Sequence, residues 1–210
     1  AHVPISKDDI EARAREAGFE TVRVTTPDAI PLAGDKLMTF IARGRHGDMD
    51  WMEDTAERRR DPRELWGEAR SVIVLGLNYG PDSDPMEALS QASNGVISVY
   101  ARGKDYHDLV KKKLKQVAGW LHRETGAEVK VFVDTAPVME KPLAEASGAG
   151  WQGKHTNLVS RDFGSWLFLG SIFTTLELAP DEPGEDHCGA CRACLDICPT
   201  EAFLGPYRLD

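Results

Sequence analysis

The sequence has 210 residues, of which 41% are hydrophobic and 28% are charged, a balance that excludes disordered and collagen-like classes. No stretch approaches the ~18 consecutive apolar residues of a membrane span, and the N-terminus lacks a signal-peptide pattern. We therefore expect a cytoplasmic protein without a membrane partner. The net charge of −9 lacks the basic excess that is usual in nucleic-acid-binding proteins.

The first part of the chain alternates helix and strand patterns. Ser6 is an expected N-cap, with Asp9 three residues on, for a helix that Gly18 ends. The continuous apolar run over 71–80 favours a strand that is buried on both faces. The other expected elements are a strand over 20–25, a helix over about 28–43, a polar turn over 43–52 and an arginine-rich segment over 57–65.

The second part continues this alternation as far as residue 179. The clearest element is a helix over 105–124, whose apolar stripe lies opposite a row of lysines. The stripe consists of Val110, Leu114, Val117 and Leu121. The remaining expectations are a surface loop over 81–95, strands over 96–101 and 128–134, a short helix over 139–148 and two strands within 165–179 that meet near Gly170.

These patterns predict an α/β (or α+β) body with one main sheet. Residues 1–179 form the expected main domain. Residues 180–210 form a small appendage that begins with an acidic loop and contains every cysteine of the chain.

The four cysteines have the spacing C-x₂-C-x₂-C-x₃-C-P, formed by Cys188, Cys191, Cys194, Cys198 and Pro199. This is the spacing of the bacterial ferredoxin run, in which the fourth cysteine ligates a second cluster. Zinc is the alternative, but zinc sites usually pair two short knuckles that lie a dozen or more residues apart. The motif therefore predicts three ligands for one 4Fe–4S cluster and one ligand for another, an incomplete set within these 210 residues.

The chain resembles the epoxyqueuosine reductase family over nearly all of its length. The resemblance is carried by RRRDPRELWGEARSVIVLGLNY, YARGKDYHDLVKKKL, VFVDTAP, PVMEKPLAEASGAGWQGKHTNLVSRDFGSWLFLGSIFTTLEL and DHCGACRACLDICPTEAF, in that order. Members of the family are longer and continue into a second cysteine-rich segment, which completes two 4Fe–4S clusters, and a helical-repeat region. The resemblance therefore covers the N-terminal half to two-thirds of a family member.

The resemblance implies a nitroreductase-like, cobalamin-binding domain followed by the start of a ferredoxin-like 4Fe–4S domain. The implied reaction is the last step of queuosine tRNA modification, in which the epoxide of epoxyqueuosine is reduced to the alkene of queuosine. The implied partners are the tRNA anticodon stem-loop that carries epoxyqueuosine and an external low-potential donor of the flavodoxin or ferredoxin type. The protein is expected to be a monomer, and both an active and an inactive fragment are compatible with the 210 residues alone.

The catalytic acid of the family matches Asp134 in VFVDTAP, which would protonate the departing oxygen. The residues themselves are compatible with this role, because Asp134 follows an apolar strand, and apolar surroundings would favour its protonated form. The alternative is that Asp134 caps the turn that follows.

The resemblance also implies a set of cobalamin contacts. The guanidinium of Arg59 would hold corrin side chains, and Leu158 and Leu169 would pack against the ring. Without the family, Tyr106 would be an ordinary residue of a first helical turn. The remaining implied cofactor contacts are Ser98, Lys104, Tyr106, Asp134, Lys154 and Asn157.

Two other functions compete with this interpretation. One is a nitroreductase-like flavoprotein with a ferredoxin appendage, and the other is a non-enzymatic corrinoid-binding or electron-transfer module. The lysines of the 105–124 helix are the best local patch for phosphate contacts, although an ordinary solvated face is the favoured explanation. No G-x-G-x-x-G or P-loop motif supports nicotinamide or nucleoside triphosphate chemistry.

Overall fold

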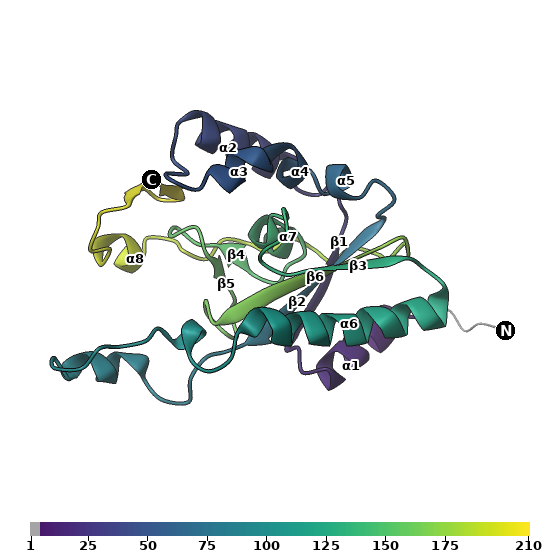
Figure 1. Cartoon of the computed structure of the whole chain (residues 1–210), viewed down its shortest axis with the longest axis horizontal. Helices are drawn as coiled ribbons and strands as arrows, with labels where there is room; N and C mark the ends of the chain where they lie inside the picture. Colours follow the sequence, from purple (N-terminus) through teal and green to yellow (C-terminus); the bar gives the residue numbers. More distant parts are fainter. Residues whose placement is uncertain (1–4) are drawn as a thin grey trace.

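The computed structural model describes residues 5–210 and shows a mixed α/β chain built around one four-stranded sheet (Figure 1). The helices are α1 (Lys7–Glu16), α2 (Pro31–Ala42), α3 (Asp50–Asp54), α4 (Ala56–Arg60), α5 (Pro62–Leu65), α6 (Tyr106–Thr125), α7 (Glu140–Ala146) and α8 (Ala193–Asp196), with 3-10 helices η1 (Pro85–Ser90) and η2 (Val99–Ala101). The strands are β1 (Thr21–Thr25), β2 (Ser71–Asn78), β3 (Val129–Phe132), β4 (Trp151–Gln152), β5 (Leu158–Val159), β6 (Leu167–Thr174), β7 (Phe203–Gly205) and β8 (Arg208–Leu209).

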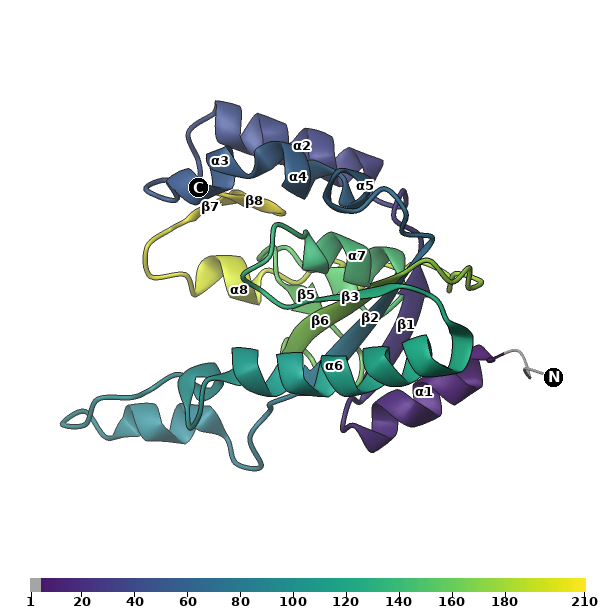
Figure 2. The same cartoon turned by 45° about the vertical axis from the view of Figure 1, so that its right-hand side comes forward.

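The main sheet has the order β1-β2-β6-β3, and every neighbouring pair is antiparallel. The central strand β2 is buried on both faces, as its apolar run predicts: Ile73 and Leu75 face one core, and Val72 and Val74 face the other. Helices α1 and α6 cover the first face, α7 covers the second, and α2–α5 form a further layer beyond α7 (Figure 2).

The predicted helix over 105–124 is confirmed as α6, which positions the candidate site at its first turn. Asp105 is the N-cap and accepts a hydrogen bond from the backbone N–H of His107, whereas Gly126 ends the helix with φ 72°. The predicted apolar stripe of α6 is fully buried against the sheet. The Ser6–Asp9 capping box of α1 is confirmed as well.

The prediction of two strands meeting near Gly170 is wrong, because β6 runs through that glycine without a break. A Cβ atom at Gly170 would lie 2.8 Å from Cδ1 of Leu114 and 3.2 Å from Cγ1 of Val110. The glycine therefore allows α6 to approach the middle of a continuous strand.

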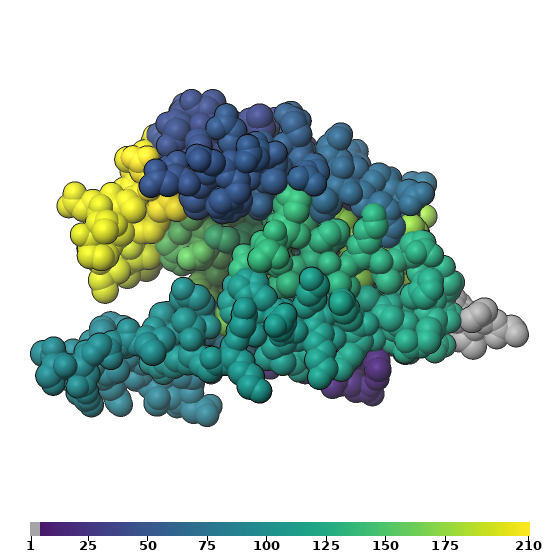
Figure 3. All heavy atoms as spheres, in the orientation of Figure 1, coloured from purple at the N-terminus to yellow at the C-terminus, as the bar shows by residue number. Residues whose placement is uncertain are grey.

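The predicted strand over 96–101 is also wrong. Val96 and Ile97 are 43% and 65% exposed, and the segment enters η2. An apolar pattern forms a stable strand only where a partner strand and a buried face are present. Together with the predicted loop over 81–95, which contains η1, these residues form an arm over 81–104 that projects from the body (Figures 1 and 3).

Three smaller features differ from the sequence patterns. The helix expected from residue 28 begins at Pro31, a residue that fits the first turn of a helix, and α3 begins inside the predicted polar turn. The short β4–β5 and β7–β8 hairpins have no clear sequence signal. Within residues 5–210, no helix is long and apolar enough to cross a membrane.

Candidate active site

Asp134 lies in the turn between β3 and α7, and a contact with a neighbouring residue stabilises its backbone conformation. Its φ is 40°, in the left-handed region, which costs most L-residues roughly 1–2 kcal/mol and which aspartate tolerates better than most. Its backbone N–H donates to Oε1 of Glu140 at 3.2 Å. The first residue of α7 therefore fixes the backbone of the turn that carries Asp134.

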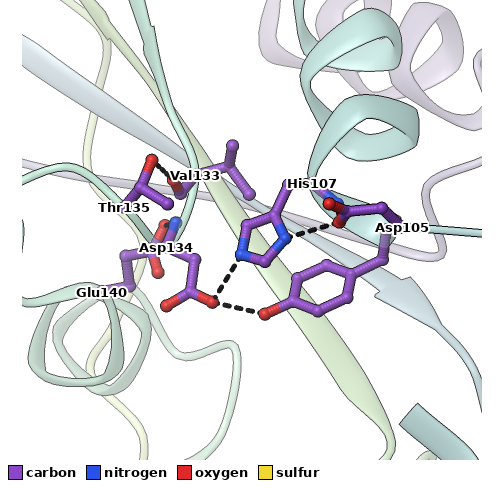
Figure 4. Close-up of polar contacts among 7 residues, drawn as sticks. Asp105, His107, Val133, Asp134, Thr135 and Glu140 are labelled. Carbon is purple, nitrogen blue, oxygen red and sulfur yellow. Dashed lines mark hydrogen bonds and ion pairs between the residues drawn. The ribbon is translucent and has the colours of Figure 1, made fainter. Parts of the chain in front are cut away.

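The carboxylate of Asp134 is held from the opposite side by the start of α6 (Figure 4). The hydroxyl of Tyr106 donates to Oδ2, and Nε2 of His107 lies 3.0 Å from the same oxygen. Nδ1 of His107 lies 2.6 Å from Oδ1 of Asp105. The side chain of Asp134 is 54% exposed, so the apolar surroundings expected from the sequence are absent on one side of this carboxylate.

The neighbours of Asp134 have shifted proton affinities. Burial raises the pKa of Tyr106, and its hydrogen bond to Asp134 acts in the same direction, so Tyr106 remains a donor at neutral pH. The hydrogen bond to Asp105 raises the pKa of His107 above its ordinary value, and the contact with Asp134 adds to this effect. Burial raises the pKa of Glu140 to about 8.

An aromatic ladder extends from this cluster across the end of the sheet at which β2 ends and β6 begins. The ring of Tyr106 stacks on Phe168 with centroids 4.0 Å apart, and Phe168 stacks on Tyr79 at 4.1 Å. Trp166 meets Tyr79 edge-on at 5.6 Å. The ladder gives the acidic cluster an apolar wall, which is a suitable surface for a flat ring system.

Arg59 approaches the same turn from α4. Its guanidinium lies 5.1 Å from the ring centroid of Trp51, and its Nη1 donates to the carbonyl oxygen of Val138 at 3.4 Å. Its Nε is buried and has no hydrogen-bond partner among the residues that the structure describes. Burial lowers the pKa of Arg59, against the attraction of Glu140 and Asp134. A buried guanidinium N–H without a partner is an available donor for a ligand.

The other predicted cofactor contacts are spread over several parts of the fold. Ser98 and Lys104 are exposed on the arm. Leu158 is 7% exposed and belongs to the core around α7, and Leu169 packs against that core. Asn157 Oδ1 accepts from Nζ of Lys141 at 3.0 Å. Among the predicted contacts, Arg59 and Tyr106 are therefore the ones that the structure brings to Asp134 by contact or charge.

A hollow lies between the arm and the C-terminal segment, as Figure 3 shows on one side of the molecule. The first turn of α6 and the first residues of β6 lie towards its inner end (Figure 1).

Residues 188–198, which contain the four cysteines and are called the cysteine segment below, contact the β4–β5 hairpin. Nζ of Lys154 donates to the carbonyl oxygens of Gly189 at 2.6 Å and Cys191 at 2.8 Å, and Nε1 of Trp151 donates to Sγ of Cys188 at 3.4 Å. All four cysteines are free thiols, and within residues 5–210 no three His, Cys, Asp or Glu side chains are grouped as metal ligands. The cluster ligands predicted by the spacing remain a prediction.

We expect Lys154→Met to loosen the cysteine segment, because charge-assisted hydrogen bonds to two carbonyl groups are lost together. Amide hydrogen exchange should become faster in peptides covering 186–198 and stay unchanged in peptides from β2 and β6. Lys36→Met, at an exposed position of α2, is the matched control. Unchanged exchange over 186–198 in the Lys154 variant would show that other contacts hold the segment.

Sequence reasoning missed His107 and Glu140 as neighbours of the acid. The signal for His107 was its place two residues after the helix N-cap, which puts it in the same first turn as Tyr106. Glu140 lies six residues after Asp134, and only the tight turn between β3 and α7 brings the two residues together.

Comparisons with known proteins identify the family. The family model described as "Epoxyqueuosine reductase QueG, DUF1730" matches residues 59–135. The epoxyqueuosine reductase of Xanthomonas campestris is 41% identical over 206 residues, with 96% of this chain and 57% of the relative aligned. That of Synechocystis is 45% identical over 179 residues, with 85% of this chain and 60% of the relative aligned.

Solved structures of epoxyqueuosine reductases have the same fold as this chain. An epoxyqueuosine reductase crystallised with an epoxyqueuosine-modified tyrosine tRNA stem loop has a TM-score of 0.83 at 28% identity, covering 97% of this chain and 54% of that chain. The Bacillus subtilis enzyme, in a structure whose catalytic aspartate loop is swung out of the active site, has a TM-score of 0.80 at 26% identity, covering 97% of this chain and 54% of that chain. A reductive dehalogenase, described as acting by B12-dependent dehalogenation, shares the fold at 14% identity with a TM-score of 0.62, covering 100% and 29%.

The fold is thus that of a mixed α/β protein shared by epoxyqueuosine reductases and a reductive dehalogenase. Within this class, the chain is similar to epoxyqueuosine reductases over nearly all of its length. It spans a little more than half the length of the curated relatives that it matches.

Proposed function

We propose that this chain is the catalytic part of an oxidoreductase that reduces the epoxide of epoxyqueuosine in tRNA to the alkene of queuosine. The observation that supports this most is the Asp134 carboxylate, which is held by Tyr106 and His107 at the end of an aromatic ladder inside a fold of the epoxyqueuosine reductase family. Its curated relatives are named epoxyqueuosine reductases, and one solved epoxyqueuosine reductase was crystallised with an epoxyqueuosine-modified stem loop.

The role proposed for Asp134 is general acid. Opening an epoxide expels an oxygen that is a poor leaving group until it is protonated, and a positioned acid typically accelerates such a step by ~10²–10⁴-fold. Tyr106 orients the carboxyl group through Oδ2, and Glu140 fixes the backbone behind it. The description of the Bacillus subtilis enzyme, with a catalytic aspartate loop that leaves its active site, supports an acid carried on a turn of this kind.

Cobalamin is the proposed cofactor of the main domain, residues 1–179, for which we propose a nitroreductase-like fold. The residues present fit such a group: Arg59 Nε is a buried donor without a partner for a corrin side chain, and the ladder offers an apolar wall. When bound, cobalamin would supply a reduced cobalt centre as the source of electrons. The aromatic side chains would exclude water from the reacting epoxide.

The proposed partial ferredoxin-type domain, residues 180–210, would deliver those electrons. Its four thiols are the soft ligands that iron–sulfur clusters require, with three for one 4Fe–4S cluster and Cys198 for a second. The proposed partners are an anticodon stem-loop carrying epoxyqueuosine and a low-potential donor of the flavodoxin or ferredoxin type. We further propose a monomer acting in the cytoplasm.

Genetic complementation tests the function, and a cofactor titration tests its basis. Disrupting the gene should leave epoxyqueuosine in bulk tRNA, and the full-length gene should restore queuosine, as measured by nucleoside mass spectrometry.

Titration of the apo-protein with cob(II)alamin should change the absorption and electron spin resonance signals of the cofactor. Binding of flavin with no response to cobalamin would support the flavoprotein, and cobalamin binding without any effect on tRNA would support the non-enzymatic module.

A further inference from the structure

His107 is the one side chain at the site that contacts two carboxylates at once. Its Nδ1 lies 2.6 Å from Oδ1 of Asp105, and its Nε2 lies 3.0 Å from Oδ2 of Asp134. We propose that His107 stores the proton used in the reaction and passes it to Asp134 in each turnover. This inference rests on the proposed function and assigns the proton source of the same site.

The geometry favours the charged form of His107. A neutral imidazole donates from only one ring nitrogen, whereas an imidazolium donates from both, and an ionised carboxylate only accepts. With a carboxylate at each nitrogen, both contacts are hydrogen bonds only when the ring carries two protons. The N-cap role of Asp105 fixes this arrangement, because Oδ1 of Asp105 also accepts the backbone N–H of His107 at 2.9 Å.

The groups around the imidazole are acidic or neutral. Asp105 and the stacked ring of Tyr106, 4.1 Å away, come from the start of α6. Asp134 comes from the turn after β3, and Glu140 of α7 lies behind it. The carboxylates of Asp105 and Asp134 raise the pKa of His107, with the Asp105 hydrogen bond as the largest cause. The side chain of His107 is 32% exposed, so water can return a proton to it.

The reaction needs such a store because carboxyl groups that water reaches are ordinarily ionised at neutral pH. A carboxylate must receive a proton before it can protonate the leaving oxygen, so a proton donor in contact with it serves the reaction. An adjacent imidazolium holds a proton at neutral pH and presents it to the carboxylate along an existing hydrogen bond. The His107–Asp134 pair thus shares one transferable proton.

The proton balance is as follows. Reduction of an epoxide to an alkene consumes two electrons and two protons and releases the oxygen as water; the low-potential donor supplies the electrons. Nε2 of His107 gives its proton to the Asp134 carboxylate, and the resulting carboxyl group gives that proton to the leaving oxygen and becomes a carboxylate again. The neutral ring keeps the Nδ1 proton on Asp105. Water reprotonates Nε2 and supplies the second proton to the oxygen.

The test compares kcat against pH for wild type, His107→Gln and Asp105→Asn in the full-length holoenzyme. His107 is a positioning residue that acts through Asp134, so its loss should lower kcat about tenfold or more at pH 7, with KM little changed. In wild type, kcat should fall as pH rises through the raised pKa of His107, because the store is full below that pKa and empty above it. The glutamine keeps an N–H donor for Asp134 but releases no proton, so this alkaline fall should disappear.

Asp105→Asn should move the alkaline fall of kcat to lower pH, because it removes the largest cause of the raised pKa of His107.

An NMR titration of histidine-labelled protein provides a readout that does not depend on activity. The His107 signal is assigned by its absence in His107→Gln. It should titrate above pH 6.5 in wild type and at lower pH in Asp105→Asn. A kcat within twofold of wild type with an unchanged pH profile in His107→Gln, or titration at or below 6.5 in wild type, would overturn the inference. If Asp134→Asn is inactive in that case, only the proton store fails; if Asp134→Asn is active, the proposed function of the site fails as well.

Discussion

Asp134→Asn should abolish most epoxide reduction while leaving cofactor binding intact. Asparagine keeps the size of the side chain and an oxygen that can accept from Tyr106, but it has no carboxyl proton to give to the leaving oxygen. Since a positioned acid contributes ~10²–10⁴-fold, we expect a loss of that order. The measurement is the single-turnover rate in the full-length protein, with chemically reduced enzyme so that electron supply does not limit the rate.

Asp8→Asn is the matched control, because Asp8 is an exposed residue of α1 on the face of the sheet opposite α7. It should react at the wild-type rate. If the Asp134 variant reacted within a fewfold of wild type, Asp134 would be a turn residue and the proton would come from elsewhere. Cobalamin binding by absorption, measured on the same preparations, separates a lost acid from a lost cofactor.

Phe173→Ala should cause the largest loss of stability among simple core truncations. Phe173 is fully buried in β6, one of the two inner strands of the sheet, and meets Phe132 edge-on with ring centroids 4.9 Å apart. Truncating a buried phenylalanine typically costs about 3–5 kcal/mol, from lost burial and from the cavity that remains. For a chain of this size each kcal/mol lowers Tm by roughly 2–4 °C, so we expect a decrease of about 6–20 °C in calorimetry.

The control for this substitution is Leu32→Ala, since Leu32 of α2 is 70% exposed. Its effect should stay within about 0.5 kcal/mol, as is usual for surface positions. A Phe173 variant as stable as the Leu32 variant would mean that β6 is not the centre of the core.

Regular elements could be predicted from the sequence where local patterns and tertiary packing agree. The stripe of α6 and the double burial of β2 are examples, because each follows from the spacing of apolar residues alone. The strand expected at 96–101 failed because nothing pairs with it, and the break expected at Gly170 failed because the glycine serves the packing of α6. Both failures depend on contacts between segments far apart in the sequence.

The candidate site shows the same division. Asp134 and the cysteine spacing could be predicted because each is a local motif. The contacts that give them their surroundings join distant positions: Tyr106 lies 28 residues from Asp134, and Lys154 lies 35 and 37 residues from its two carbonyl partners. The exposure of Asp134 could not be predicted either, because it depends on how segments far apart in the sequence pack around the turn.

The most direct test of the central claim is the reaction itself. The full-length protein, reconstituted anaerobically with cobalamin and iron–sulfur clusters and reduced by a low-potential donor, is mixed with an anticodon stem-loop that carries epoxyqueuosine, and the nucleosides are analysed by mass spectrometry. We predict loss of one oxygen atom from the modified nucleoside and formation of queuosine, which requires both the donor and cobalamin. Unchanged epoxyqueuosine in the presence of fully loaded, reduced protein would contradict the account.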